Sequence, residues 1–267
     1  MMKKILSISI ISCILISLWG FSNLPKERKN IRINSIFQYS TLSALLEGIY
    51  DGELTVGELK KQGNFGLGTF NALDGELILL DGKCYKATSD FKIQQMSDSV
   101  KVPFAAISNF SSDTTIKITH PIRIKDLENK LDSLIGKPNL IYGCKITGRF
   151  DSISIRSVPK QEKPYKRLIE AYKKQGVITY LDQQGVLLGY KFPTYLKEVN
   201  LDDYHFHFLS SDKTKGGHLL NCTLISGEVS VAFIHNYTLQ LPDNDFFNHA
   251  IFTNKKSELM LIEGSKK

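Results

Sequence analysis

The sequence predicts a mixed α/β (α+β) protein in which strands outnumber helices and form two lobes. Two Asp-Gly turns separate apolar runs between residues 63 and 85, which is the pattern of antiparallel strands joined by tight turns. Residues 124–135 have apolar side chains at helical spacing. Residues 159–164 are polar and bracketed by prolines, as is typical of a linker. The 267 residues, 42% of them hydrophobic, suffice for one large domain or two small lobes.

The N-terminus has the pattern of an export signal. Two lysines precede an uncharged, mainly apolar run over residues 5–19, and small residues suited to cleavage follow as far as Ser22. Because this run is shorter than the roughly 20 residues that span a bilayer, we expect residues 1–22 to be a signal peptide and the mature protein to be secreted or periplasmic. Lipid anchoring at Cys13 is the weaker alternative, because the apolar run continues beyond that cysteine.

The polar residues 23–35 are expected to form a flexible tether before the N-terminal lobe, residues 36–160. The glycines of GNFGLGTF lack the spacing of a nucleotide-binding loop and open no helix, so no nucleotide cofactor is expected. The elements predicted in this lobe are a short helix near 41–46 capped by Ser40 or Thr41, a three-stranded meander over 63–85, a strand at 102–110, a helix at 124–135 ended by Gly136, and strands at 140–145 and 152–158.

The C-terminal lobe, residues 161–267, is expected to begin with a helix over 165–174 and to continue as short strands from Val177. It contains Tyr204-His205-Phe206-His207-Phe208. Side chains alternate along a strand, so His205 and His207 would lie on one face and the aromatic side chains on the other.

A third histidine follows this pair after a turn. Residues 210–217 are rich in turn formers, so a strand that begins near His218 can bring its imidazole beside His205 and His207. Three neutral imidazoles with an open fourth position are typical of a catalytic zinc site, whereas a structural zinc site is normally closed by four ligands. A lone His-x-His pair would more often be packed or at the surface. The remaining histidines have no such neighbours and are expected to be ordinary residues: His120, His235 and His249.

Three charged residues carry no clear signal by themselves. Arg156 lies among serines on a strand face opposite two isoleucines, where a barrel-rim or surface ion pair is the commoner role and a fork for a substrate carboxylate the alternative. Glu76 follows an Asp-Gly turn, where an exposed carboxylate is usual. Glu263 lies near a C-terminus that would normally fray.

Charge and cysteine content exclude some classes of function. The net charge of +7 is scattered along the chain, and basic residues are not interleaved with aromatic ones, so nucleic-acid binding is not expected despite a pI near 9.0. Removal of residues 1–22 would leave Cys84, Cys144 and Cys222, an odd number of cysteines without metal-knuckle spacing, so we expect buried thiols rather than a disulfide framework.

Three separated motifs together resemble the bacterial α-acetolactate decarboxylases: GNFGLGTFNALDGELILLDGKCY, the segment IRSVPKQ, and the His-x-His pair followed by Gly-Gly-His. The resemblance runs from about Leu42 to Glu263. It implies a fold of two α/β lobes with the metal between them, usually as a homodimer, a small 2-hydroxy-3-oxo acid as substrate and no organic cofactor. The family's site residues carry over to zinc ligands His205, His207 and His218 and to active-site residues Arg156, Glu76, Glu263 and Thr69.

The implied chemistry suits these residue types. Loss of carbon dioxide from 2-acetolactate leaves electrons that flow into the adjacent ketone, and the resulting enediolate must be stabilised and then protonated to give acetoin. Zinc (Zn²⁺) would act as a Lewis acid, Arg156 would orient the carboxylate, and Glu76 or Glu263 would donate the proton.

Two alternatives stay open from the residues alone. One is a different exported three-histidine zinc enzyme, such as a hydrolase with Glu76 or Glu263 as its base. The other is a non-catalytic protein that binds a metal or ligand through the histidines.

Overall fold

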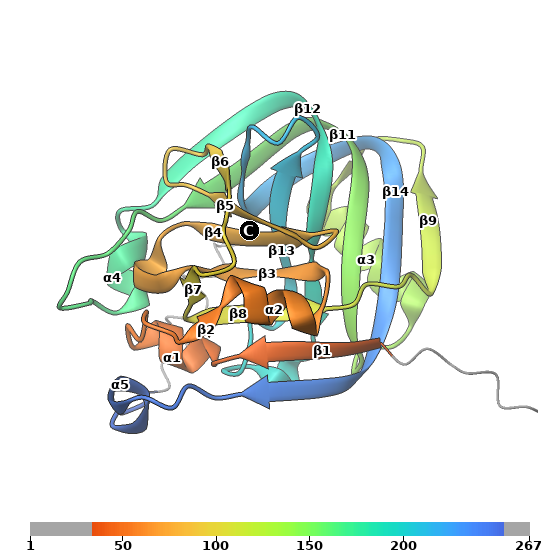
Figure 1. Ribbon diagram of the computed structural model, residues 1–267. Helices are drawn as coiled ribbons and strands as arrows, with labels where there is room; N and C mark the ends of the chain where they lie inside the picture. Colours follow the sequence, from red (N-terminus) through yellow and green to blue (C-terminus); the bar gives the residue numbers. More distant parts are fainter. Residues whose placement is uncertain (1–33, 254–267) are drawn as a thin grey trace, which may run out of the picture. The chain divides into compact units, whose positions relative to one another are not determined.

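Strands outnumber helices in the computed structural model, which describes residues 34–253 (Figure 1). These residues all belong to one compact unit. The predicted signal peptide, most of the predicted tether and Glu263 lie outside the described residues.

The strands are β1 (Asn34–Tyr39), β2 (Leu54–Thr55), β3 (Phe65–Thr69), β4 (Glu76–Leu80), β5 (Lys83–Ala87), β6 (Ile93–Gln95), β7 (Lys101–Val102), β8 (Phe104–Ser108), β9 (Thr114–Ile118), β10 (Ile122–Arg123), β11 (Ile141–Ser157), β12 (Gly176–Phe192), β13 (Asp203–Ser210) and β14 (Gly216–Gln240). The helices are α1 (Leu42–Leu46), α2 (Val56–Gln62), α3 (Ile124–Ile135), α4 (Leu168–Tyr172) and α5 (Asp245–Asn248), with short 3-10 turns η1 (Asn71–Leu73) and η2 (Thr194–Leu196).

One 12-stranded sheet carries almost all of these strands, in the order β11-β12-β13-β14-β1-β8-β3-β4-β5-β6, with β9 and β10 also paired to β14. Strand β11 pairs with both β12 and β14, and β13 pairs with the same two strands, so these four close into a ring. Strand β1 joins the ring to the N-terminal strands by pairing in parallel with β14 and antiparallel with β8. Figure 1 shows the long, bent strands of the ring beside the shorter N-terminal strands.

The predicted mixed fold is confirmed, and so are several of its elements. Helix α1 is capped by Thr41, whose hydroxyl accepts the Ala44 N–H at 3.2 Å. Strands β3, β4 and β5 form the predicted meander. Helix α3 covers the predicted range and ends at Gly136, which adopts the left-handed conformation that favours glycine (φ 61°).

Three element boundaries differ from the prediction. The strands expected at 140–145 and 152–158 are one strand, β11, whose pairing with β14 shifts register around Phe150, so the two ranges are joined through an irregular, bulged stretch. The strand expected at 102–110 is divided into β7 and β8 at Pro103, which has no N–H for a ladder hydrogen bond. The helix expected over 165–174 is limited to α4, because Arg167 has an extended backbone (ψ 153°).

The sheet runs across the lobe boundary predicted at residues 160 and 161. Strand β11 lies before this boundary, yet it pairs along its length with β12 and β14, which lie after it. Strand β1 begins at Asn34, so it includes the last two residues of the predicted tether. The division into two lobes stays a prediction, and the sheet itself is continuous.

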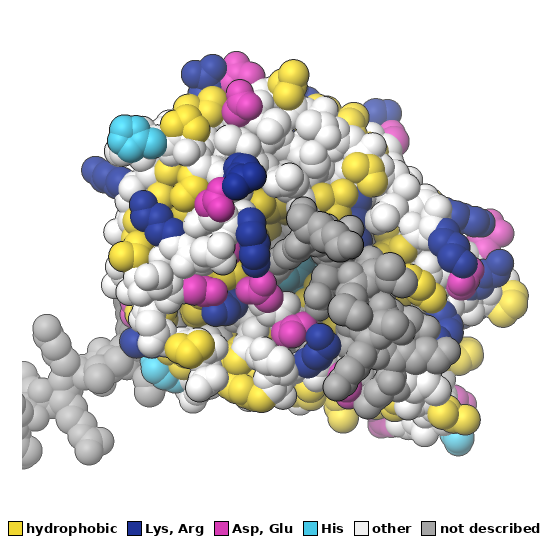
Figure 2. All heavy atoms as spheres, turned by 180° about the vertical axis from the view of Figure 1, so that it is seen from behind, with side chains coloured by type: hydrophobic (Ala, Val, Ile, Leu, Met, Phe, Trp, Pro, Cys, Tyr) yellow, Lys and Arg dark blue, Asp and Glu magenta, His cyan; other side chains and the backbone are white. Residues whose placement is uncertain are grey.

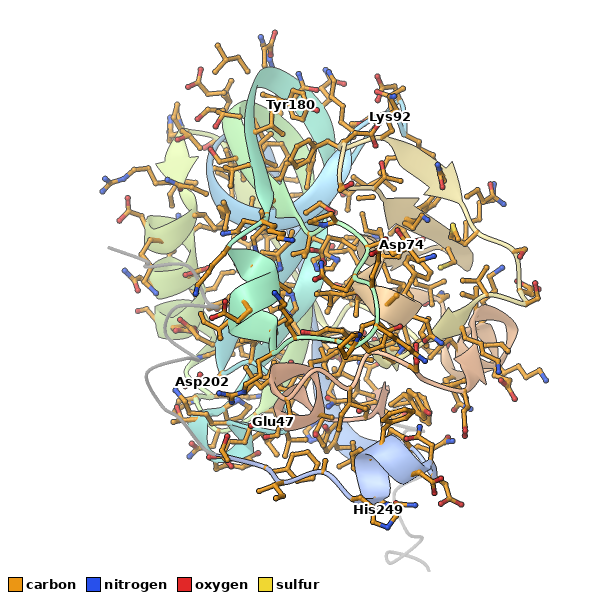
Figure 3. The ribbon with its side chains drawn as sticks, turned by 90° about the vertical axis from the view of Figure 1, so that its left-hand side faces the viewer. Glu47, Asp74, Lys92, Tyr180, Asp202 and His249 are labelled. Atoms are coloured by element: carbon orange, nitrogen blue, oxygen red, sulfur yellow. The ribbon has the colours of Figure 1, made fainter. Side chains whose placement is uncertain are left out.

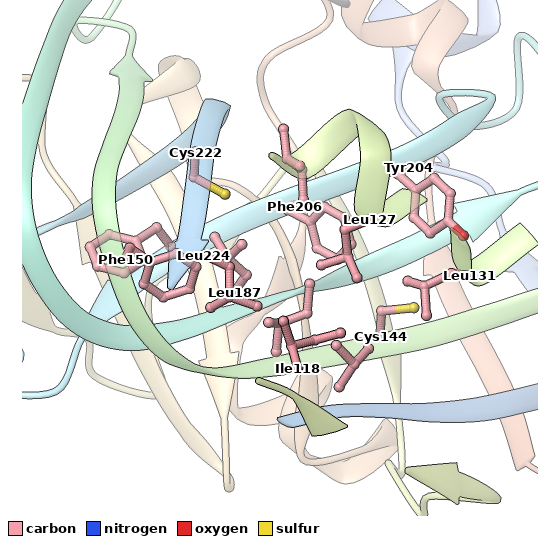
Figure 4. Packing of buried hydrophobic residues seen from close by; sticks show 14 of the residues in the cluster. Ile118, Leu127, Leu131, Cys144, Phe150, Leu187, Tyr204, Phe206, Cys222 and Leu224 are labelled. Carbon is pink, nitrogen blue, oxygen red and sulfur yellow. The ribbon is translucent and has the colours of Figure 1, made fainter. Parts of the chain in front are cut away.

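The main core lies against the face of β13 that is turned away from the histidines. Tyr204, Phe206 and Phe208 pack there with apolar residues of β11, β14 and α3 (Figure 4), as the alternation predicts. The three described cysteines are free and buried, also as predicted, and burial raises the pKa of the Cys84 and Cys222 thiols to about 12.

A close approach of two backbones fixes the strand that carries the histidines. A Cβ on Gly189 of β12 would lie 1.8 Å from the His205 carbonyl oxygen, so only glycine lets β12 and β13 pair at this point. Charged side chains of both signs are interspersed over the face shown in Figure 2, which agrees with the scattered charge of the sequence.

Candidate functional site

Three histidines meet where β13 and β14 pair. His207 and His218 are directly opposite each other across the two strands, and His205 lies two residues before His207 on the same face. One ring nitrogen from each histidine lies within 4.8 Å of those of the other two. The turn at residues 210–217 therefore brings the third imidazole beside the first pair, as predicted.

His207 is oriented by the N-terminal part of the chain. Its Nδ1 lies 2.8 Å from the Leu77 carbonyl oxygen of β4, and a carbonyl can only accept, so Nδ1 carries the proton and Nε2 keeps its lone pair. Burial lowers the pKa of His207 to about 4, so the ring is neutral near pH 7. Both features suit a metal ligand.

Arg156 lies in the same row of residues. It pairs with His218 across β11 and β14, and its Nη2 donates to His218 Nε2 at 3.1 Å. The side chain is 1% exposed, so the surface ion pair that the sequence favours for this residue taken alone is wrong. Among the residues that the structure describes, no carboxylate lies within 4.0 Å of the guanidinium, so its positive charge is buried without an acidic partner.

Glu76 and Thr69 face the histidines from paired strands. Glu76 Oε2 is 3.5 Å from His207 Nε2, and its side chain is 13% exposed rather than the open surface group expected from the turn. Burial raises the pKa of Glu76 to about 7, an effect that the nearby Arg156 opposes. Thr69 pairs with Glu76 in register and donates its hydroxyl to the Gly75 carbonyl at 2.8 Å, which holds the turn that precedes Glu76.

A pocket opens in front of these polar groups. Helices α1 and α4 and the segment before β13 line its other side with mostly apolar residues. The lining consists of Leu42, Leu45, Gly68, Thr69, Leu73, Gly75, Glu76, Phe104, Val158, Leu168, Tyr172, Asn200, Leu201, His205, His207 and His218. A small ligand in this pocket would touch the histidines and Glu76 on one side and hydrocarbon on the other, which strengthens electrostatic interactions by excluding water.

The structure separates the site histidines from the rest. His120, His235 and His249 are exposed, and Figure 3 shows His249 at the end of α5. Two further groups belong to the site but were not predicted from the sequence: Tyr172, which lines the pocket, and the Leu77 carbonyl, which accepts from His207. Neither has a sequence signal, since one is a helical tyrosine among lysines and the other a backbone atom in an apolar strand.

The three histidines fit a zinc ion chemically. Zinc accepts imidazole nitrogens, and catalytic sites combine three protein ligands with one open position. Here the three nitrogens converge beside a pocket, and the Leu77 carbonyl supplies the outer hydrogen bond that usually orients such a ligand. These ligands do not by themselves select one metal, because imidazole also suits other transition metals.

Comparison with known proteins identifies a family for this chain. The family model for alpha-acetolactate decarboxylase matches residues 36–254. An alpha-acetolactate decarboxylase from Methanosarcina mazei is 36% identical over 245 residues, which cover 91% of this chain and 85% of the relative. One from Brevibacillus brevis is 38% identical over 82% of this chain and 77% of its own. The crystal structure of the Bacillus subtilis strain 168 enzyme superposes with a TM-score of 0.85 at 34% identity, covering 86% of this chain and 100% of that one.

The buried charge of Arg156 gives a prediction on stability. Arg156→Met replaces a buried cation that has no acidic partner among residues 34–253 with an apolar chain of similar length, so the free energy of unfolding should stay within about 1 kcal/mol of wild type or rise. The measurement is urea unfolding of both proteins without metal. Arg149→Met is the control on the same strand, because Arg149 is exposed and its ion pair with Asp182 contributes little. A loss of more than about 3 kcal/mol in Arg156→Met would instead make Arg156 a structural residue.

Proposed function

The chain belongs to the alpha-acetolactate decarboxylase family and is a decarboxylase enzyme, and on this premise we propose its reaction and its metal. We propose that it converts (S)-2-hydroxy-2-methyl-3-oxobutanoate to (R)-acetoin and carbon dioxide. The reaction would use a zinc ion held by His205, His207 and His218. The family assignment removes the hydrolase and the non-catalytic binding protein as alternatives. The observation that carries the finer proposal is one pocket that is lined by the three convergent histidines and the half-buried Glu76, with the buried Arg156 donating to one of those histidines, His218.

Arg156 would bind the substrate carboxylate. Its guanidinium is buried and positively charged, and its planar N–H donors match a carboxylate in geometry. Because the surroundings exclude water, this charge acts at full strength on an anion in the pocket. Arg156 thus fixes the carbon–carbon bond that breaks in one orientation relative to the histidines.

Zinc, when bound at the three histidines, would supply Lewis acidity toward the negative charge that develops on the ketone oxygen. The chain itself must then deliver one proton, because the carbon that loses carbon dioxide gains a hydrogen in acetoin.

We assign the proton delivery to Glu76, which faces the histidines from β4 at 3.5 Å from His207. A carboxyl group fixed on one side of the planar enediolate protonates one face, which accounts for a chiral product. Thr69 supports this arrangement by holding the Gly75 carbonyl. Glu263 lies outside the described residues, so its role rests on the family resemblance.

Removal of metal should abolish the activity reversibly. Purified residues 23–267 should release carbon dioxide and acetoin from racemic acetolactate, lose this activity after chelation and regain it with zinc. His207→Ala should lower the bound zinc measured by elemental analysis, whereas His249→Ala, at an exposed position, should not. Full activity from metal-free, folded protein would rule out the zinc dependence.

Substitution of Glu76 should separate decarboxylation from protonation. Glu76→Gln keeps the size of the side chain but removes the acid, so kcat should fall by about 10²- to 10⁴-fold while the protein stays folded. Any acetoin formed should lose enantiomeric purity, as measured by chiral gas chromatography. Glu228→Gln, on an exposed part of β14, is the matched control. Unchanged kcat and purity in Glu76→Gln, with a loss in Glu263→Gln, would transfer the role to Glu263.

We also propose that the protein is exported and assembles as a homodimer. Export is supported by the sequence pattern of residues 1–22. The intact mass of protein recovered from the producing cells should match a chain that begins at Asn23, and light scattering should give twice the mass of one chain. A mass that corresponds to a lipidated Cys13 would replace secretion by membrane anchoring.

A further inference from the structure

Arg156 is flanked by two side chains that take no part in the proposed reaction, Tyr172 and Gln175. The Tyr172 ring lies under the guanidinium, with the Arg156 Cζ atom 4.4 Å from the ring centroid. Gln175 Oε1 is 3.4 Å from Nη1, and the Tyr172 hydroxyl is 3.5 Å from Nη2. The ring gives a cation–π contact, and the two polar contacts are long ones.

The segment that supplies both residues is held independently of Arg156. Leu168 and Ala171 of α4 are buried, each 1% exposed. Arg167, which precedes α4, forms a 2.9 Å ion pair with Glu47 beside α1, the residue labelled low in Figure 3. Gln175 N–H donates to the Tyr172 carbonyl at 3.1 Å. The ring and the amide therefore have fixed positions against which the guanidinium can be placed.

Neither side chain neutralises the arginine. Burial raises the pKa of the Tyr172 phenol, so its ring stays uncharged, and Gln175 is a neutral amide. A carboxylate at either place would form an ion pair and occupy the N–H donors that a substrate needs. A neutral ring and a neutral amide leave the full charge available.

The guanidinium also keeps unused donors. It carries five N–H groups, and Nε has no hydrogen-bond partner among the described residues although it is buried. A buried donor without an acceptor is unfavourable, and a carboxylate bound in the pocket would relieve this.

We propose that Tyr172, which lines the pocket, and Gln175 are positioning residues that hold the Arg156 guanidinium in place and aim its free donors at the carboxylate of the substrate. This inference rests on the proposed function, since it takes the ligand of Arg156 to be the carboxylate of a 2-hydroxy-3-oxo acid. The two residues confer recognition of the charged substrate over the neutral product.

Inhibition by two probes tests this assignment. One is 2-hydroxy-2-methylpropanoate, which has the hydroxyl and carboxylate of the substrate but no ketone; the other is acetoin, which has no carboxylate. Tyr172→Leu should weaken inhibition by the carboxylate about 3- to 30-fold, the range of a cation–π contact, and leave inhibition by acetoin within about twofold. Tyr172→Phe keeps the ring and should recover most of the loss. Tyr180→Leu, on β12 and labelled in Figure 3, is the matched control.

Gln175→Glu provides a second variant. Its carboxylate would lie near Nη1 and pair with Arg156, so the carboxylate probe should bind less tightly and KM for acetolactate should rise more than kcat falls. The thermal midpoint should stay the same or rise, because the variant gives a buried cation a partner. A role limited to packing predicts no such combination of gained stability and lost carboxylate binding.

The outcomes separate this inference from the proposed function. Wild-type protein that neither decarboxylates acetolactate nor is bound by the carboxylate probe in calorimetry would overturn both. An active wild type in which Tyr172→Leu weakens both probes equally, or neither, would overturn the positioning role and leave the decarboxylase in place. If Tyr172→Leu does not fold, Gln175→Glu decides the question by the same two probes.

Discussion

The site depends on one constraint, the register of three neighbouring strands. His218 of β14 stands directly opposite Arg156 of β11 on one side and opposite His207 of β13 on the other. Residues opposed in this way have side chains on the same face a few ångströms apart. A slip of one residue in either pairing would turn Arg156 or His207 toward the core and place apolar side chains at the pocket. The register thus determines the chemistry as well as the packing, and Gly189 protects it where β12 approaches β13.

Arg156, His218 and His207 form a row across the three strands that contains one positive charge and two imidazoles but no acidic residue. Arg156 is buried beside His218, His207 is held neutral by burial, and Glu76 has a pKa raised to about 7. This arrangement of charges is costly by itself, because a buried cation normally requires a pair. An anion bound beside Arg156 would supply that pair, and a cation at the histidines would itself lower the pKa of Glu76 again. The charges of the described residues therefore favour an anionic ligand bound together with a metal ion.

The sequence predicted those parts of the structure that depend on local pattern. Alternation along residues 204–208 gave the face of the histidines, turn formers gave the return to His218, and the cap at Thr41 gave α1. The parts that failed depend on distant contacts. Nothing near Phe150 distinguishes a bulge in one strand from a turn between two, because the choice depends on the pairing of β11 with β14. The burial of Arg156 likewise cannot be predicted from the serines and isoleucines around it, because the helix that covers it, α4, comes from another segment of the chain.

The continuity of the sheet explains why the site needs both parts of the chain. The three histidines come from β13 and β14, but the carbonyl that orients His207, the carboxyl of Glu76 and the hydroxyl of Thr69 come from β3 and β4. The C-terminal strands alone would hold the three imidazoles side by side, but nothing would fix the proton of His207 on Nδ1. A metal ligand without this outer hydrogen bond binds its ion less tightly. The N-terminal meander alone would present a carboxyl group with no cation to act beside. Because β1 joins the two parts through β14 and β8, the same hydrogen-bond ladder that fixes the register also fixes the distance between acid and ligands.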